Sequence, residues 1–171
     1  MARFPLGFIP KYGFHKGSGR RWFGASRDSG NRMHAACDLI ARRGTPVYAA
    51  VGGLALYKKK FYEGTYELVV VSPHFWIRYG EIEKELPPGV IIGESVSEGQ
   101  HIANVGKLKM LHFEMYKGTE VGELTNPWNK KYDYVEGKKY KRRKDLMDPT
   151  PFLEQWAAWT DWSQTDPSDW Q

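Results

Sequence analysis

The stretch KLKMLHFEMYKG, residues 107–118, alternates apolar and polar side chains around a single histidine. In a β-strand successive side chains point to opposite faces, so this pattern separates two sets of residues. One face takes Leu111, Phe113 and Met115, and the other takes Met110, His112, Glu114 and Tyr116. The first set is typical of a core, whereas the second predicts either a crowded polar seam or the wall of a site.

Other short apolar runs on both sides of this stretch have the same character and are separated by Gly and Pro. They predict strands over residues 45–51, 54–62, 66–72, 75–82 and 109–116. The runs at 66–72 and 75–82 are joined by only two residues, Pro73 and His74, which is typical of a hairpin. We therefore expect a mostly β protein with a small, mainly antiparallel sheet.

Composition limits the classes of function. The 171 residues fit one domain, and 18 Gly with 10 Pro favour a turn-rich β fold over a helical bundle. A net charge of +5 favours an anionic partner: nucleic acid, an acidic polysaccharide or an anionic envelope. With one cysteine, no intramolecular disulfide can form. The first residues lack an apolar signal-peptide core, and no run is long enough to span a membrane. We therefore expect synthesis in the cytoplasm without a signal peptide.

The chain divides into four predicted segments. Residues 1–21 are an irregular lead-in, 22–128 the main domain, 129–145 a basic loop, and 146–171 a short helix and a Trp-rich tail packing on the domain. The helix is expected to begin with Thr150 as N-cap and Pro151 at the first helical position. This last segment contains four tryptophans, Trp156, Trp159, Trp162 and Trp170. They are expected to pack on the domain or, alternatively, to form a platform on which sugars stack.

The basic loop holds eight Lys or Arg interleaved with three Tyr. One interpretation is a solvated surface loop, and the other is a docking patch for an anionic polymer. On the second interpretation the contacts to the anionic envelope come from Lys138, Lys139, Lys141, Arg142, Arg143 and Lys144. No recognised nucleic-acid motif accompanies the loop, so nucleic acid is the weaker candidate.

Three residues form a candidate metal site. His34 and Asp38 lie four residues apart, and together with His112 they give two imidazoles and one carboxylate. Such a set leaves the fourth position of a tetrahedral zinc open for water, as catalytic zinc sites require. A His and an Asp at this spacing also occur by chance. Cys37 would point to the opposite side of a strand from Asp38, as a buried apolar filler or, alternatively, a ligand or redox thiol.

Four segments in order make the sequence similar to a known family. They are HAACDLIARRGTPVYAAVGG (34–53), YELVVVSPHFWIRYGEI (66–82), VSEGQHIANVG (96–106) and LHFEMY (111–116). This pattern resembles the lysostaphin-type, or LytM-like, zinc metallopeptidases, which are peptidoglycan endopeptidases, and it covers roughly residues 22–118. The resemblance implies an antiparallel sheet with a groove formed by loops. It also implies one zinc ion bound by His34, Asp38 and His112.

Two positions depart from the family pattern. Met110 stands where the family has the first His of His-x-His, and Glu81 stands where it has the His of Tyr-x-His-Leu. Both usual histidine bases are therefore replaced. A carboxylate can accept the proton in zinc-assisted hydrolysis, so we predict Glu81 as the general base. The alternative is that Glu81 pairs with Arg78 or a nearby lysine on an exposed strand edge.

The remaining candidates have smaller predicted roles. Tyr79 and Tyr116 are candidates for lining the substrate groove or for hydrogen-bonding an oxyanion. Glu114 is expected to be structural, and His74 and His101 to lie away from the metal. His15 receives no assignment.

The sequence thus predicts a zinc endopeptidase that acts on peptidoglycan, a monomer of the phage endolysin type or a related lytic enzyme, working at the cell wall after release. The alternative is a catalytically degenerate, zinc-containing module that binds peptidoglycan or regulates a partner. Met110 favours this alternative, and the complete ligand set argues against it.

Overall fold

The computed structural model describes residues 2–125, 134–135 and 138–164. The protein is mostly β, as the sequence predicts. Its longer strands are β5 (Gly53–Lys60), β6 (Tyr66–Val71), β7 (Trp76–Ile82) and β10 (Met110–Tyr116). The shorter ones are β1 (Ser26–Arg27), β2 (Arg32–Met33), β3 (Cys37–Ile40), β4 (Pro46–Tyr48), β8 (Ser95–Val96), β9 (His101–Asn104), β11 (Tyr134–Val135), β12 (Lys138–Lys139) and β13 (Leu146–Met147).

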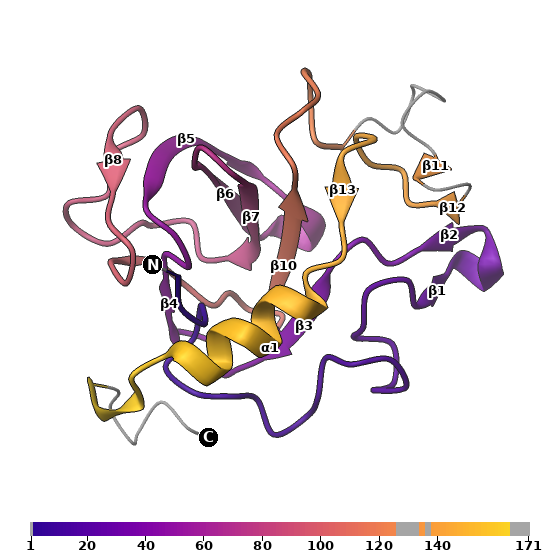
Figure 1. Ribbon diagram of the computed structural model, residues 1–171, viewed down its shortest axis with the longest axis horizontal. Helices are drawn as coiled ribbons and strands as arrows, with labels where there is room; N and C mark the ends of the chain where they lie inside the picture. Colours follow the sequence, from indigo (N-terminus) through magenta and orange to yellow (C-terminus); the bar gives the residue numbers. More distant parts are fainter. Residues whose placement is uncertain (1, 126–133, 136–137, 165–171) are drawn as a thin grey trace.

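The main sheet has the antiparallel order β13-β10-β7-β6-β5-β8, and β3 also pairs with β10 (Figure 1). Smaller pairings join β1 to β2, β4 to β9 and β11 to β12. The five predicted strands are confirmed as β4, β5, β6, β7 and β10. The sequence pattern missed the other strands, each of which has two to four residues and lies outside a longer alternating run; they are β1, β2, β3, β8, β9, β11, β12 and β13.

Helical structure is limited in the described part of the chain. The α-helix α1 covers Thr150–Trp159, and the 3-10 turns are η1 (Asp28–Gly30), η2 (Tyr62–Gly64) and η4 (Trp162–Gln164). The predicted helix is confirmed, but Thr150 is its first residue rather than its N-cap, a position taken by Pro149. The Thr150 N–H donates to Asp148 Oδ1 over 2.8 Å. No helix in the described ranges is long and apolar enough to cross a membrane.

The core lies between one face of the sheet, α1 and the lead-in. Trp156 of α1 meets Phe113 of β10 edge to face, with ring centroids 6.3 Å apart. Residues 2–21 contain no helix or strand, yet Phe4, Leu6 and Phe14 are buried in the same core. The lead-in is thus part of the folded unit.

The tryptophans after residue 150 behave differently from one another. Trp156 is buried and Trp162 packs against the core, as predicted. Trp159 is 60% exposed, so the prediction that it packs on the domain is wrong. Trp159 faces solvent because it lies on the outer side of an amphipathic helix. Trp170 lies outside the described residues.

Candidate active site

The register of two strands brings together the first two members of the cluster. β3 runs antiparallel to β10, and Asp38 lies directly opposite His112. Residues paired in this way point to the same face of a sheet. The His112 Nδ1 atom is 2.9 Å from Asp38 Oδ1.

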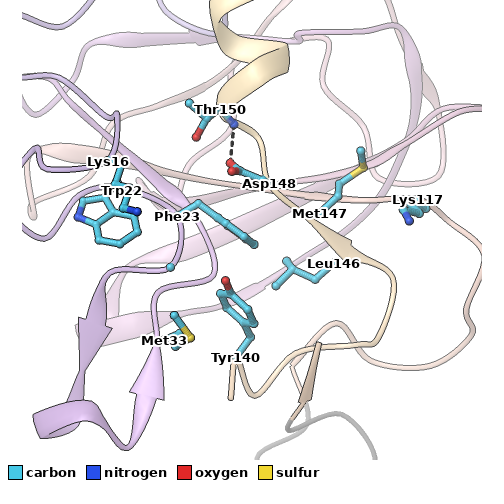
Figure 2. A pocket seen from close by; sticks show the side chains of 11 residues that line it. Lys16, Trp22, Phe23, Met33, Lys117, Tyr140, Leu146, Met147, Asp148 and Thr150 are labelled. Carbon is cyan, nitrogen blue, oxygen red and sulfur yellow. Dashed lines mark hydrogen bonds between the residues drawn. The ribbon is translucent and has the colours of Figure 1, made fainter. Parts of the chain in front are cut away.

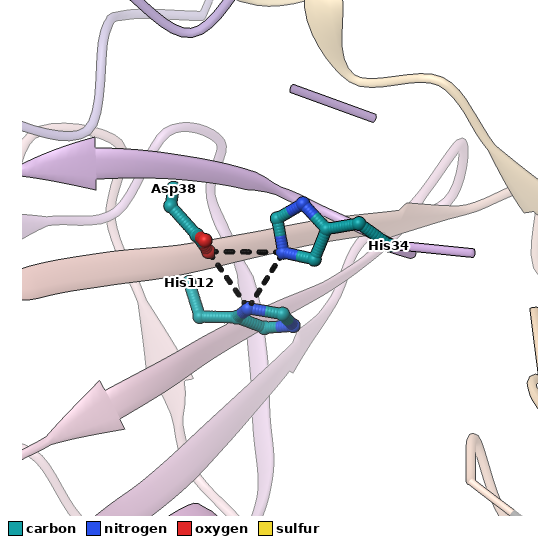
Figure 3. Close-up of side chains that lie close together, drawn as sticks. All are labelled: His34, Asp38 and His112. Carbon is teal, nitrogen blue, oxygen red and sulfur yellow. Dashed lines mark hydrogen bonds and ion pairs between the residues drawn. The ribbon is translucent and has the colours of Figure 1, made fainter. Parts of the chain in front are cut away.

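His34 reaches the same point from the segment before β3. Its backbone is held by two hydrogen bonds, from Gly24 N to His34 O (2.7 Å) and from His34 N to Ala25 O (2.8 Å). Its Nε2 atom is 3.1 Å from Asp38 Oδ1 and 3.4 Å from His112 Nδ1, and Figure 3 shows the three side chains converging. All three are buried. The predicted ligand residues therefore meet, with their donor atoms within 4.8 Å of one another.

The far side of each imidazole is occupied by a hydrogen-bond acceptor. His34 Nδ1 lies 3.0 Å from the carbonyl oxygen of Trp22, and His112 Nε2 lies 2.7 Å from Glu114 Oε1. When each imidazole carries only the N–H directed at its acceptor, the lone pairs of His34 Nε2 and His112 Nδ1 face Asp38. Metal-binding histidines in proteins are commonly oriented in this way.

Burial and mutual hydrogen bonds shift the pKa values of all three residues of the cluster. Each imidazole lies between two hydrogen-bond acceptors, and burial lowers the pKa of His34, against smaller raising effects of Asp38. Burial also acts against charge on His112, yet the hydrogen bonds to Asp38 and Glu114 outweigh it and raise its pKa to about 9. Burial alone would raise the pKa of Asp38, but bonds from His112 and His34 hold it well below its usual range. Two imidazoles and one carboxylate are a ligand set that fits a divalent metal, whose binding would displace the proton that His112 directs at Asp38.

A bulge in β7 determines where Glu81 lies. Gly80 pairs with both His112 and Glu67, whereas the next pairing is between Ile82 and Tyr66, which leaves Glu81 as an extra residue. Its φ of 61° is in the left-handed region, which is unfavourable for a residue with a side chain. Bulges of this kind redirect side chains next to active sites. Regular alternation would place Glu81 on the core side with Tyr79.

The carboxylate of Glu81 is buried and close to the cluster in electrostatic terms. Its Oε2 atom has no hydrogen-bond partner among the described residues. Burial raises its pKa to about 7, with a smaller lowering by His112 and a smaller raising by Asp38. The alternative pairing with Arg78 is wrong, because Arg78 is buried between Glu67 (2.8 Å) and Glu114 (2.9 Å). A carboxyl with a pKa near neutrality is suited to general base catalysis.

The chain is similar to known proteins in sequence and in fold. Residues 32–127, more than half of the chain, match the family model of peptidase family M23. The chain belongs to peptidase family M23. No curated protein matches the chain by sequence.

Solved structures show the same fold as this M23 peptidase. CbpA from L. salivarius REN is 20% identical with a TM-score of 0.60, over 92% of this chain and 99% of that one. The catalytic domain of the antimicrobial peptidase lysostaphin from Staphylococcus simulans is 20% identical with a TM-score of 0.52, over 77% and 88%. LytU is 23% identical with a TM-score of 0.52, over 72% and 74%. At these identities the likeness concerns the fold.

Neither tyrosine predicted for the groove of the M23 peptidase can line one. Tyr79 is fully buried on the apolar face, where its hydroxyl accepts a hydrogen bond from Ala50 N (2.8 Å). Tyr116 is also fully buried, and its hydroxyl donates to Glu114 Oε2. Both predictions are wrong, because strand alternation gives the face of a side chain but not what covers that face.

The predicted docking patch of the M23 peptidase is also partly wrong. Arg142 and Arg143 are buried: Arg142 pairs with Glu114 (2.9 Å), and Arg143 Nε donates to Asp145 Oδ1 (2.7 Å). Buried carboxylates draw these two arginines inward, since an uncompensated buried charge is costly. Lys139 and Lys144 are exposed, Lys141 is half-buried, and the side chain of Lys138 lies outside the described residues.

Glu114 is more closely tied to the site of the M23 peptidase than its expected structural role suggests. It is fully buried and accepts hydrogen bonds from His112, Arg142, Arg78 and Tyr116. Burial would raise its pKa, but Arg142, Arg78 and His112 hold the pKa well below its usual range. The only sequence signal was its place on the same strand face as His112.

Other residues of the M23 peptidase lie away from the cluster. His74 is exposed in the β6–β7 turn, and His101 bonds Asn104 through Nε2 (2.8 Å). Cys37 is fully buried, which raises the pKa of its thiol to about 12 and makes it a core side chain. Met110 is half-buried at the start of β10, opposite Ile40.

A cavity of about 460 Å³ lies beside the segment that holds His34 (Figure 2). Trp22 and Phe23 form part of its wall, together with Tyr140, Leu146 and Met147. Its described lining includes neither the cluster residues nor Glu81. Trp22 therefore connects the two places, with its carbonyl at His34 and its ring at the cavity.

Proposed function

We propose that this M23 peptidase is a zinc-dependent endopeptidase that hydrolyses peptide bonds of bacterial peptidoglycan. The observation that carries the proposal is the meeting of three buried ligand atoms, from His34, Asp38 and His112, beside the buried carboxylate of Glu81, whose Oε2 has no hydrogen-bond partner among the described residues. Family membership supports peptide hydrolysis, and the fold is that of lysostaphin, an antimicrobial peptidase.

The residues present fit one zinc ion, which His34 Nε2, Asp38 Oδ1 and His112 Nδ1 would hold. A bound zinc ion would polarise the scissile carbonyl and lower the pKa of the attacking water. Trp22 O and Glu114 Oε1 keep both imidazoles aimed at the site through their outer N–H groups.

Glu81 supplies the proton transfer in this mechanism. Its carboxylate accepts a proton from the attacking water and returns it to the leaving amine, the role of the two absent histidines. Burial by β7 and its neighbours raises its proton affinity to the range that both steps require. Arg27, with Nη2 3.6 Å from Asp38 Oδ2, offsets part of the negative charge.

Origin and location follow from the same proposal. A lytic enzyme of the phage endolysin type would be made in the cytoplasm and act on the cell wall after release. The exposed lysines Lys139 and Lys144 would support contact with an anionic envelope, in place of the full six-residue patch.

The proposal is tested on purified Gram-negative sacculi. The zinc-loaded protein is compared with the same protein under a chelator and after zinc is restored, and released muropeptides are identified by mass spectrometry. New peptide termini that disappear on chelation and return with zinc are expected. A protein that binds zinc and peptidoglycan but releases nothing would instead be a degenerate binding module, with Met110 marking the loss of chemistry.

A further inference from the structure

The metal ligand His112 is held from behind by a single buried carboxylate. Glu114 Oε1 accepts from His112 Nε2 over 2.7 Å, and the side chain of Glu114 is completely inaccessible to solvent. A hydrogen bond at one nitrogen of an imidazole fixes the orientation of the ring and so the direction of the other nitrogen. The position of Glu114 therefore sets the direction of His112 Nδ1.

The same oxygen of Glu114 receives a two-pronged contact from Arg142. Arg142 Nε is 3.0 Å and Nη2 is 2.9 Å from Glu114 Oε1, while Nη1 donates to Lys141 O over 3.1 Å. The other oxygen, Oε2, is held by Arg78 Nη1 at 2.9 Å. Glu114 is thus clamped between two guanidinium groups and has no freedom to turn.

Arg142 comes from a part of the chain outside the family match, which ends at residue 127. Lys141, the residue before it, has a φ of 50°, a left-handed conformation that turns the chain at this point. Arg142 and Arg143 are both buried, although they are adjacent in a strongly basic run. Each is directed to a different carboxylate, Glu114 for the first and Asp145 for the second.

We propose that Arg142 is a positioning residue of the metal centre, which fixes Glu114 so that His112 aims Nδ1 at the point shared with His34 and Asp38. This inference rests on the proposed function, because it assumes that the cluster of His34, Asp38 and His112 binds zinc. It makes the C-terminal segment a necessary part of the site of this peptidase.

Loss of the guanidinium leaves Glu114 Oε1 with His112 as its one hydrogen-bond partner among the described residues and removes a compensating charge from a buried carboxylate. Such a carboxylate relaxes away from its place, and the ring of His112 loses its anchor. A lysine restores the charge but supplies a point contact rather than the planar fork that meets Glu114 with two N–H groups. Two substitutions therefore separate the effect of geometry from that of charge: Arg142→Met removes both the charge and the planar fork, whereas Arg142→Lys removes only the fork.

The test compares Arg142→Met and Arg142→Lys with a matched control, Arg143→Met, in the full chain. The control also removes a buried arginine, but its partner is Asp145 and not Glu114. Zinc affinity is measured by competition with a chromophoric chelator, ligand geometry by the visible spectrum of the cobalt-substituted protein, and folding by thermal unfolding without metal.

We expect Arg142→Met to weaken zinc binding about 10–100-fold and to alter the cobalt spectrum, with Arg142→Lys in between. Arg143→Met should lose thermal stability but keep the wild-type zinc affinity and spectrum. Wild-type affinity in a folded Arg142→Met, or an equal loss in Arg143→Met, would overturn the proposal. Should Arg142→Met not fold, Arg142→Lys and Glu114→Gln decide the question by the same readouts. A wild-type chain that binds no zinc overturns the proposed function itself, a different result from unchanged affinity in the variants.

Discussion

The two faces of the β3–β10 pair are equally buried but differ in composition. On one face Cys37 lies opposite Phe113, and on the other Asp38 lies opposite His112. Phe113 and Cys37 are 0% exposed, and Asp38 and His112 are 6% and 7% exposed. Burial therefore does not distinguish a core from a site in this protein.

The faces differ in how their atoms are satisfied. The apolar face is held by packing, for example of Phe113 against Tyr79 and Trp156. On the polar face, Glu114 is saturated by donors, whereas His34, Asp38 and His112 direct atoms that can bind a metal toward one point. Buried ligand atoms of three residues within reach of one ion indicate a metal site, and a carboxylate whose oxygens are satisfied by donors indicates support for that site.

Loss of a ligand on the polar face should have the largest effect. We expect His112→Ala to abolish metal binding and peptidoglycan hydrolysis, because two protein ligands do not make a tetrahedral zinc site. Zinc should also no longer raise the unfolding temperature. Equilibrium dialysis and calorimetric scans with and without zinc measure both effects. His74→Ala, in the exposed turn, is the control, and retained zinc binding in His112→Ala would remove His112 from the ligand set.

Replacement of the proposed base should come next. Glu81→Gln keeps the shape but cannot accept a proton, so we expect kcat to fall about 10²–10⁴-fold while zinc still binds. A general base must be ionised, and burial raises the pKa of Glu81 to about 7 without metal. The activity of the wild type should therefore rise with pH through an acidic limb whose apparent pKa lies above the usual range of a carboxyl group. A bound cation should lower this apparent pKa. Full activity in Glu81→Gln would refute the assignment.

A cavity made on the apolar face should lower the stability of the protein without changing its affinity for zinc. We expect Phe113→Ala to reduce the free energy of unfolding by about 3–5 kcal/mol, through lost burial and a cavity between Tyr79 and Trp156. Urea unfolding measures the loss. Zinc affinity of the folded protein should be retained, and a loss of affinity as large as that of His112→Ala would show that the two faces are not independent.

The smallest effect is expected at Cys37, which shares the apolar face. Burial raises the pKa of its thiol to about 12, so the reactive thiolate is nearly absent at pH 8. We expect the native protein not to react with a thiol reagent such as DTNB, and the protein in guanidinium chloride to react with one equivalent. Rapid reaction of the native protein would place Cys37 on an accessible surface and contradict the division of the faces.

Local sequence was sufficient for part of this description. The alternation in residues 107–118 predicted which side chains of β10 share a face, since a strand has a period of two whatever surrounds it. The strands β4, β5, β6, β7 and β10 and the helix at Thr150 were predicted from local patterns as well. The family motifs indicated His34, Asp38 and His112 together, and the structure brings them within reach of one another.

Sequence by itself thus determined the β character, the faces of the main strands and the residues that meet at the cluster. Only the tertiary structure decided that Tyr79 and Tyr116 are covered, that a bulge redirects Glu81, and that Arg142 turns inward to Glu114. The physical reason is that alternation depends on neighbours along the chain. Whether Arg142 faces water or a buried partner depends instead on the carboxylate of Glu114, which lies 28 residues away in the sequence.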